Sequence, residues 1–191
     1  MRARKRDRVR EQLTEAAFTL FLRDGYDATT VDAIAAAAEV SRRTFFRYFG
    51  TKEDVLLAWV ELRDGALRAA LAERPRGEPP LATVRAALAP LVAYYEAAPE
   101  RWRAIMRLSA AHPVLGGRRR EKQARWERTL AEGVAAALGV GADALRAQLA
   151  ARVGLAAFET AVEAWMRDDP PGALSRLVDD AFALLARDFG S

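Results

Sequence analysis

Two adjacent arginines at the start of a short helical segment have the side chains needed to read DNA bases. Arg42 and Arg43 follow Ser41, which is a typical helix N-cap residue. A guanidinium can donate two parallel hydrogen bonds to O6 and N7 of guanine, which discriminates against a wrong base by about 1–3 kcal/mol. A solvated helix face is the alternative interpretation of such a pair, and a core position is the alternative for Phe46. The residues predicted to contact bases are Arg42, Arg43, Thr44 and Phe46.

The elements expected around these arginines form a helix-turn-helix pattern. The first helix of this pair would follow the N-cap residue Thr30 and bury Ile34 with its apolar neighbours. The second helix of the pair would span 42–49. Phe45 and Phe49 are four residues apart, so both should face the core. In a helix-turn-helix the second helix lies in the major groove of DNA. The pattern therefore predicts DNA binding.

A second set of polar and basic residues suits the phosphate groups of DNA. Thr30 and Lys52 stand at expected helix starts, where free amides and the helix dipole attract anions. Contacts of this kind fix the position of a protein on the duplex and carry no base preference. The residues predicted to contact phosphates are Thr30, Ser41, Arg47, Tyr48 and Lys52.

Basic charge gathers on the same part of the chain. Residues 1–52 hold 11 Lys and Arg against 7 Asp and Glu, whereas residues 53–191 hold 19 of each. The whole net charge of +4 therefore lies on the segment with the helix-turn-helix pattern, as expected of a DNA-binding unit. The first residues, Arg2, Arg4, Lys5 and Arg6, fit either a basic arm that reaches the DNA or a disordered, solubilising tail.

Composition excludes several other classes of function. The chain of 191 residues has no cysteine and a single histidine, His112, so it lacks disulfides, thiolate metal sites and most His-based catalytic schemes. We expect no catalytic residues, no metal and no cofactor. No apolar run approaches the roughly 18 residues of a membrane span. Glu11 and Glu15 interrupt the segment after the basic start, so no signal core follows it, and we expect a cytoplasmic protein without membrane contact.

Helical periodicity continues along the whole chain, without a strand signal. The first helix is expected from about Asp7 to Arg23 and a fourth from Lys52 to about Glu73, followed by a linker over 74–80. Further helices are expected at about 81–97, 99–111, 117–138, 142–167 and 171–188. We predict an all-α protein of about nine helices. Residues 1–52 would be an N-terminal DNA-binding domain with three helices, and residues 53–191 a C-terminal ligand-binding and dimerisation domain.

Residues 28–56, ATTVDAIAAAAEVSRRTFFRYFGTKEDVL, resemble the TetR family of bacterial transcriptional regulators. The remaining two-thirds of the chain is similar in length, helicity and layout, and the spacing of Trp126, Leu130 and Val134 looks like members with an acyl-CoA-type ligand domain. Two positions depart from the family pattern. Glu39 stands where glycine is common, and it tolerates a left-handed conformation less well. Phe46 replaces the usual tyrosine and cannot donate a hydrogen bond to phosphate.

The resemblance implies a homodimer whose two N-terminal domains bind successive major grooves of a near-palindromic double-stranded DNA operator. It also implies that the last two helices pair with a second copy, although they could simply complete the domain core. The dimer-interface residues expected on this basis are Ala157, Ala161, Leu174, Leu177, Val178, Ala181, Phe182 and Leu185.

The same resemblance implies a small-molecule inducer in the C-terminal domain. The candidate pocket residues are Tyr94, Trp102, Met106, Trp126, Phe158, Glu159 and Glu163. Each aromatic residue could instead be plain core, and the two glutamates could be exposed or form salt bridges at the dimer rim.

These observations predict a ligand-responsive transcriptional repressor that a small hydrophobic or amphipathic ligand releases from DNA. The alternative is a constitutive or architectural DNA-binding dimer without a ligand, which a solid C-terminal core would favour. A helical enzyme is disfavoured, because Glu159 and Glu163 are the only acid/base pair proposed and nothing positions a substrate beside them.

Overall fold

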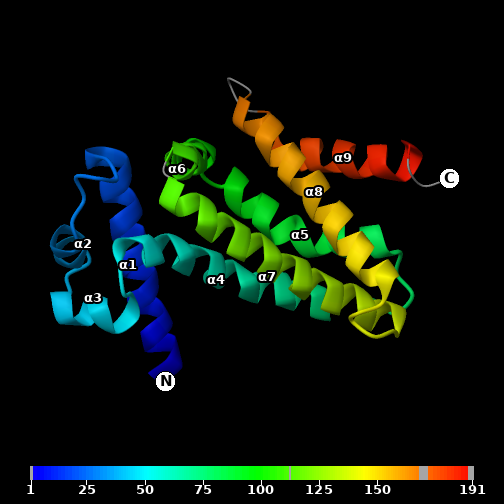
Figure 1. Ribbon diagram of the computed structural model, residues 1–191, viewed down its shortest axis with the longest axis horizontal. Helices are drawn as coiled ribbons and strands as arrows, with labels where there is room; N and C mark the ends of the chain where they lie inside the picture. The colour runs from blue at the N-terminus through cyan, green and yellow to red at the C-terminus, as the bar shows by residue number, and fades with distance from the viewer. Residues whose placement is uncertain (1, 112, 168–171, 189–191) are drawn as a thin grey trace. The chain divides into compact units, whose positions relative to one another are not determined.

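The computed structural model describes residues 2–111, 113–167 and 172–188, and these ranges contain helices and loops but no strand (Figure 1). The prediction of an all-α protein is confirmed. The described helices are α1 (Arg2–Asp24), α2 (Val31–Ala37), α3 (Arg42–Tyr48), α4 (Lys52–Ala72), α5 (Pro80–Glu96), α6 (Pro99–Ala111), α7 (Pro113–Leu138), α8 (Leu145–Arg167) and α9 (Leu174–Asp188). His112 lies outside the described residues.

Helix α1 begins earlier than its apolar pattern indicates. It starts at Arg2, so the predicted start near Asp7 is wrong, and the basic residues at positions 2–6 extend the helix instead of forming a disordered tail. The basic arm that reaches the DNA stays a prediction. Arginine, lysine and alanine all have high helix propensity, and no glycine or proline interrupts this stretch. Apolar periodicity missed the first turns because their sequence, Arg-Ala-Arg-Lys-Arg, contains no large apolar residue.

The chain divides into two compact units, Met1–Leu62 with Ala104–Lys122 and Arg63–Arg103 with Gln123–Ser191. Helix α4 begins in the first unit and ends in the second. The boundary predicted at residue 52 coincides with the start of α4, whereas the contacts divide ten residues later. No helix in the described ranges has the length and apolarity needed to cross a membrane.

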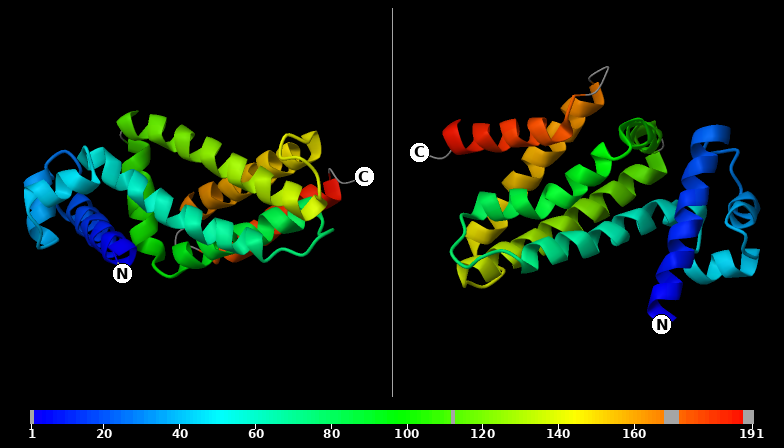
Figure 2. Two further views of the ribbon diagram at one scale, coloured as in Figure 1. Left: turned by 90° about the horizontal axis from the view of Figure 1, so that it is seen from below. Right: turned by 180° about the vertical axis from the view of Figure 1, so that it is seen from behind.

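The core of the first unit lies between α1, α2 and α3, which are grouped together in Figure 2. Helix α1 contributes Leu13, Phe18 and Phe21, all at most 1% exposed. Phe45 and Phe49 are 0% and 3% exposed, as their spacing predicted. Because Phe45 points inward, the opposite face of α3 is left toward solvent.

The second unit is built around α8, which packs against both α5 and α9 (Figure 1). Small side chains allow this close packing: a Cβ at Gly154 would lie 2.5 Å from Cγ1 of Val84 on α5. Aromatic rings fill the space beside it, with the rings of Tyr95 and Phe158 stacked at 6.4 Å between centroids and those of Tyr95 and Trp165 stacked at 6.5 Å.

Candidate DNA-binding interface

The turn between α2 and α3 sets the direction in which α3 leaves the core. The amide of Glu39 donates to the carbonyl of Ala36 at 3.0 Å, and the amide of Val40 donates to that of Ala35 at 2.9 Å. These two bonds define a Schellman C-cap, in which the residue after the cap is left-handed. Glu39 has a φ of 54° and is therefore in the left-handed conformation, which is unfavourable for a residue with a Cβ atom.

Both N-caps predicted for the helix-turn-helix are present. The hydroxyl of Thr30 accepts a hydrogen bond from the amide of Ala33 at 3.1 Å, and that of Ser41 accepts one from the amide of Thr44 at 3.1 Å. The hydroxyls of Ser41 and Thr44 also lie 3.0 Å apart. The caps therefore fix the starts of α2 and α3, and the hydroxyl groups at both starts lie on the exposed side of the unit.

The outer face of α3 carries most of the residues predicted to contact bases. Arg42 and Arg43 are exposed, Thr44 is half-buried, and Phe46 is 46% exposed. A core position for Phe46 is therefore wrong. Phe46 packs edge-on against the buried Phe45, with 5.5 Å between ring centroids. This contact holds an apolar ring on a surface that is otherwise basic.

The two arginines have different surroundings. Nη1 of Arg42 donates to Oδ2 of Asp32 on α2 at 2.7 Å, and its guanidinium lies 5.5 Å from the centroid of the Phe46 ring. Within the part of the chain that the structure describes, Arg43 makes no ion pair and no side-chain hydrogen bond. Sequence reasoning missed Asp32, because nothing in a sequence shows that residues ten positions apart on two helices form a pair.

The side chain of Lys52, which was predicted to contact a phosphate, makes its hydrogen bonds within the first unit. Its Nζ donates to the carbonyl oxygens of Tyr26 at 2.7 Å, Thr29 at 3.2 Å and Asp27 at 3.4 Å. It also lies 4.4 Å from the centroid of the Tyr26 ring. An ammonium group has three donors, and three carbonyls occupy them here. Lys52 therefore joins the start of α4 to the loop between α1 and α2.

A second contact reinforces this junction. The hydroxyl of Tyr26 donates to Oε1 of Glu53 at 2.6 Å. Burial, followed by this bond to a carboxylate, raises the pKa of Tyr26 well above its usual value. Burial alone would raise the pKa of Glu53, but hydrogen bonds, first that from Tyr26, lower it overall. Neutral tyrosine and ionised glutamate thus stabilise each other.

The remaining phosphate candidates stay on the surface of α3. Arg47 is exposed and its guanidinium lies 5.2 Å from the centroid of the half-buried Tyr48 ring. Thr30 and Ser41, the N-caps of α2 and α3, are exposed on the same unit. The exposed side of this unit thus carries basic and polar groups that could contact a DNA backbone.

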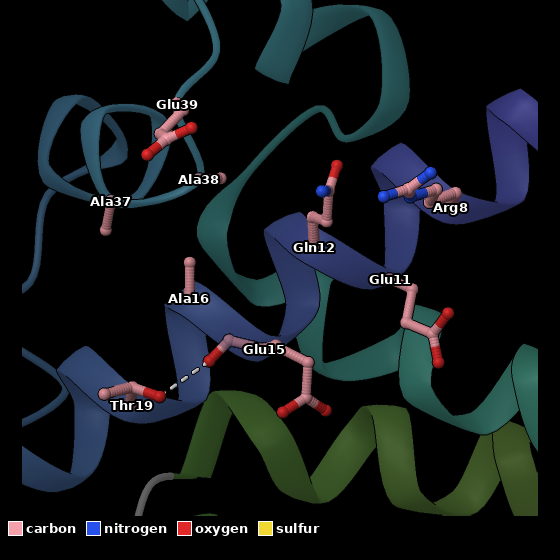
Figure 3. Close-up of a pocket in the computed structure, with 9 residues that line it drawn as sticks. All are labelled: Arg8, Glu11, Gln12, Glu15, Ala16, Thr19, Ala37, Ala38 and Glu39. Atoms are coloured by element: carbon pink, nitrogen blue, oxygen red, sulfur yellow. Dashed lines mark hydrogen bonds between the residues drawn. The ribbon is translucent and has the colours of Figure 1, made fainter.

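A surface groove of the first unit has the opposite charge. It has a volume of about 490 Å³ and lies between α1 and the turn that precedes α3 (Figure 3). Glu11 and Glu15 of α1 and Glu39 of the turn bring three carboxylates to its lining, against the single arginine Arg8. Carboxylates repel phosphate, so this groove is unsuited to the DNA backbone.

The predicted ligand-pocket residues are divided between the two units. Met106 belongs to the first, whereas Trp102, Trp126 and Phe158 belong to the second and are each 2% exposed. The ring of Tyr94 lies 4.8 Å from that of Trp102 between centroids. The three buried rings fit the plain-core alternative.

The two candidate glutamates also differ from each other. Glu159 is half-buried and accepts a hydrogen bond from Nε2 of Gln123 at 3.1 Å, whereas Glu163 is exposed. Glu159 is therefore a half-buried, hydrogen-bonded polar group of the second unit. Solvent exposure, the alternative considered for both, holds for Glu163.

The residues expected at a dimer interface need correction. Five of them are already buried inside a single chain and have little surface left for a second copy: Ala157, Ala161, Leu174, Val178 and Phe182. They pack where α8 and α9 meet each other and α5. The other three, Leu177, Ala181 and Leu185, are half-buried. For the five buried residues the alternative holds, in which these helices complete the core of the domain.

The apolar side chains that do face solvent on these helices were missed. Leu145 and Leu149 of α8 are 78% and 57% exposed, and Leu184 of α9 is 46% exposed. Leu145 and Leu149 are four residues apart, with the exposed Ala156 further along the same helix. This spacing was a usable signal, because residues three or four apart share one face.

A helix-turn-helix that exposes arginines on its second helix, joined to a larger helical unit, defines a DNA-binding transcriptional regulator. Residues 13–59 match the family model of bacterial regulatory proteins, tetR family, and residues 78–190 match that of the MftR C-terminal domain. The chain belongs to the tetR family of bacterial regulatory proteins.

Individual relatives are similar over different parts of the chain. The transcriptional regulator TcmR of Streptomyces glaucescens is 52% identical over 81 residues, which span 42% of this chain and only 36% of TcmR. The mycofactocin biosynthesis transcriptional regulator MftR of Mycobacterium tuberculosis is 28% identical over 166 residues, which span 87% of this chain and 84% of MftR.

Among solved structures, the fold is similar to that of FadR from Thermus thermophilus, a TetR family transcriptional repressor in complex with lauroyl-CoA. The TM-score is 0.60 at 26% identity, with 92% of each chain covered.

Proposed function

We propose that this regulator represses transcription as a homodimer that binds a near-palindromic operator and leaves it when a small hydrophobic or amphipathic ligand binds the C-terminal unit. The observation that carries the DNA-binding part is the outer face of α3. There Arg42, Arg43 and Phe46 stand exposed opposite the buried Phe45. Thr44 lies beside them, and Thr30, Ser41, Arg47 and Tyr48 supply the phosphate contacts.

Selection of bound fragments from random duplexes tests this part. Because the two recognition helices of such a dimer contact successive major grooves, the selected fragments should contain two inverted half-sites about 34 Å apart between centres. Fragments with one half-site, or with no shared sequence, would contradict the proposal.

For the dimer, the exposed apolar residues of α8 and α9 are better candidates than the buried ones. Leu145 and Leu149 share one face of α8, and exposed large apolar side chains on one face favour a protein partner. Leu149→Glu places a charge on this surface without disturbing the core, because Leu149 is 57% exposed. The variant should sediment as a monomer with an unchanged helical spectrum, whereas the matched variant Leu22→Glu, at a 39% exposed position of α1, should remain dimeric. A dimeric Leu149→Glu protein would overturn this assignment.

The ligand class is supported by a solved structure whose fold is similar to that of this chain over most of its length. FadR of Thermus thermophilus was solved with lauroyl-CoA, an amphipathic acyl thioester. Lauroyl-CoA added to the complex of this protein with its selected operator should release the DNA in a mobility-shift assay. It should also raise the melting temperature of the free protein, because a ligand at a hundred times its Kd stabilises by about 2.7 kcal/mol.

The same titration distinguishes the alternative function. A constitutive DNA-binding dimer would keep its operator at every lauroyl-CoA concentration and would show no thermal shift. That result with lauroyl-CoA, and with free fatty acids of the same chain length, would favour the constitutive function over the ligand-responsive one.

A further inference from the structure

Arg42 is held at two points on the outer face of α3. Its Nη1 donates to Oδ2 of Asp32 at 2.7 Å, and its guanidinium lies 5.5 Å from the centroid of the Phe46 ring. Asp32 comes from α2 and Phe46 from the next turn of α3. The ion pair and the ring together restrain the guanidinium on a surface that otherwise faces solvent.

The restraint leaves one donor edge of the guanidinium available. Only Nη1 bonds to Asp32, and Nε and Nη2 of Arg42 make no hydrogen bond to any residue within the described ranges. Nε and Nη2 form a parallel donor pair that matches O6 and N7 of guanine. A group held by a neighbouring hydrogen bond loses less conformational freedom when it binds its target.

We propose that Asp32 is a positioning residue that orients Arg42 to read a guanine in the major groove. This inference rests on the proposed function, in which α3 enters that groove. Asp32 itself touches no base and acts through Arg42. Arg43 has no such restraint from the described residues, so only Arg42 presents a pre-oriented donor edge.

Two features of the pair favour this role over a role in folding. Its side chains are 63% and 61% exposed, and ion pairs this open to solvent contribute little to folding stability. A carboxylate beside a phosphate-binding surface also repels DNA, so its presence there weakens binding unless it serves an arginine. The helix dipole explains why a negative charge such as that of Asp32 is favourable in the first turn of α2. It does not explain why Asp32 pairs with Arg42.

A double-mutant cycle in operator binding tests the proposal. The proteins are wild type, Asp32→Ala, Arg42→Ala and the double variant, with Asp27→Ala as the matched control for loss of one exposed carboxylate from the same unit. Each is titrated against the selected operator, a random duplex, and an operator in which guanines are replaced one at a time by 7-deazaguanine, which lacks the N7 acceptor. Melting temperatures without DNA show that every variant is folded.

The proposal predicts that Asp32→Ala weakens operator binding by about tenfold and leaves random-duplex binding unchanged. The loss should disappear in the Arg42→Ala background, and both variants should become insensitive to 7-deazaguanine at the same single position. Asp27→Ala should show no loss that is specific to the operator.

Two results would overturn it. Tighter binding of Asp32→Ala to both duplexes would mean that Asp32 only sequesters Arg42 or repels phosphate. An equal loss in the Arg42→Ala background would mean that Asp32 acts without Arg42. Failure of the proposed function is distinct, because wild-type protein would then select no sequence at all.

Discussion

The ammonium group of Lys52 lies 2.7 Å from the carbonyl oxygen of Tyr26 and 4.4 Å from the centroid of the Tyr26 ring. This single side chain joins the first residue of α4 to the loop that precedes the helix-turn-helix. A movement of the start of α4 would therefore carry that loop with it. These contacts give Lys52 a role in folding stability. A lysine that only bound phosphate would have no such role.

Lys52→Met should lower the free energy of unfolding by about 1.5–3 kcal/mol, because it keeps the apolar stem and leaves carbonyls without their charged donor. Thermal unfolding followed by circular dichroism, without DNA, measures this loss. Arg47→Met is the matched control: Arg47 is exposed, so its loss should leave the melting temperature unchanged and weaken DNA binding. The opposite result would be a Lys52→Met protein with the wild-type melting temperature whose DNA binding depends less steeply on salt, by about one unit. Lys52 would then contact a phosphate instead.

Glu39→Gly should stabilise the protein by about 0.5–1 kcal/mol, since glycine adopts the left-handed conformation of the α2–α3 turn without the penalty of a Cβ. Ala38→Gly is the matched control. Ala38 has φ of −88°, so glycine there gains nothing and should destabilise. Urea denaturation measures both changes, and a neutral or destabilising Glu39→Gly would show that the Glu39 side chain contributes more than its backbone strain costs.

The contact between Tyr26 and Glu53 predicts a dependence of stability on alkaline pH. The pKa of Tyr26 is raised in the folded protein, so its contribution to stability is complete below the unfolded value of about 10 and is lost as pH rises above it. Wild-type protein should therefore lose stability above about pH 10 more steeply than Tyr26→Phe, which has no phenol to ionise. Parallel curves for the two proteins in urea denaturation would contradict the assigned hydrogen bond.

The pKa of Glu53 is lowered, so the sign is reversed at acidic pH. Its contribution is present above the usual value of 4.5 and is lost as pH falls through the lowered pKa. Tyr26→Phe removes the largest of the hydrogen bonds that lower this pKa. The stability of the wild-type protein should therefore fall more steeply at acidic pH than that of Tyr26→Phe.

Gly154→Ala should destabilise the second unit by about 1–3 kcal/mol, because the added Cβ would lie 2.5 Å from Cγ1 of Val84. Gly65→Ala in α4 is the matched control. A Cβ at Gly65 meets nothing within 4 Å, so alanine should stabilise this helix by about 0.5–1 kcal/mol. If both variants show the same shift in their urea midpoint, close packing of α5 and α8 does not depend on Gly154.

Local signals in the sequence predicted the helix-turn-helix well. Thr30 and Ser41 cap helices through bonds to residues three positions away, and the four-residue spacing of Phe45 and Phe49 reports a shared buried face. Such features depend on short stretches of chain. They are therefore visible without knowledge of the tertiary structure.

Features that depend on tertiary contacts could not be read in the same way. Lys52 reaches carbonyls 23 to 26 positions away, and carbonyl groups carry no sequence signature. The apolar face of α9 is clear in the sequence, but periodicity does not tell whether the same chain or a second copy covers it. Val178 and Phe182 illustrate this, because α9 already buries them within one chain.

The most direct measurement is the binding of wild type and Arg43→Ala to the selected operator and to a random duplex at one salt concentration. Arg128→Ala, at an exposed position of α7, serves as the control for loss of a positive charge outside α3. If the outer face of α3 reads bases, Arg43→Ala should lose operator affinity by about tenfold more than random-duplex affinity, and Arg128→Ala should lose neither. Equal losses on both duplexes, or no loss, would contradict the account.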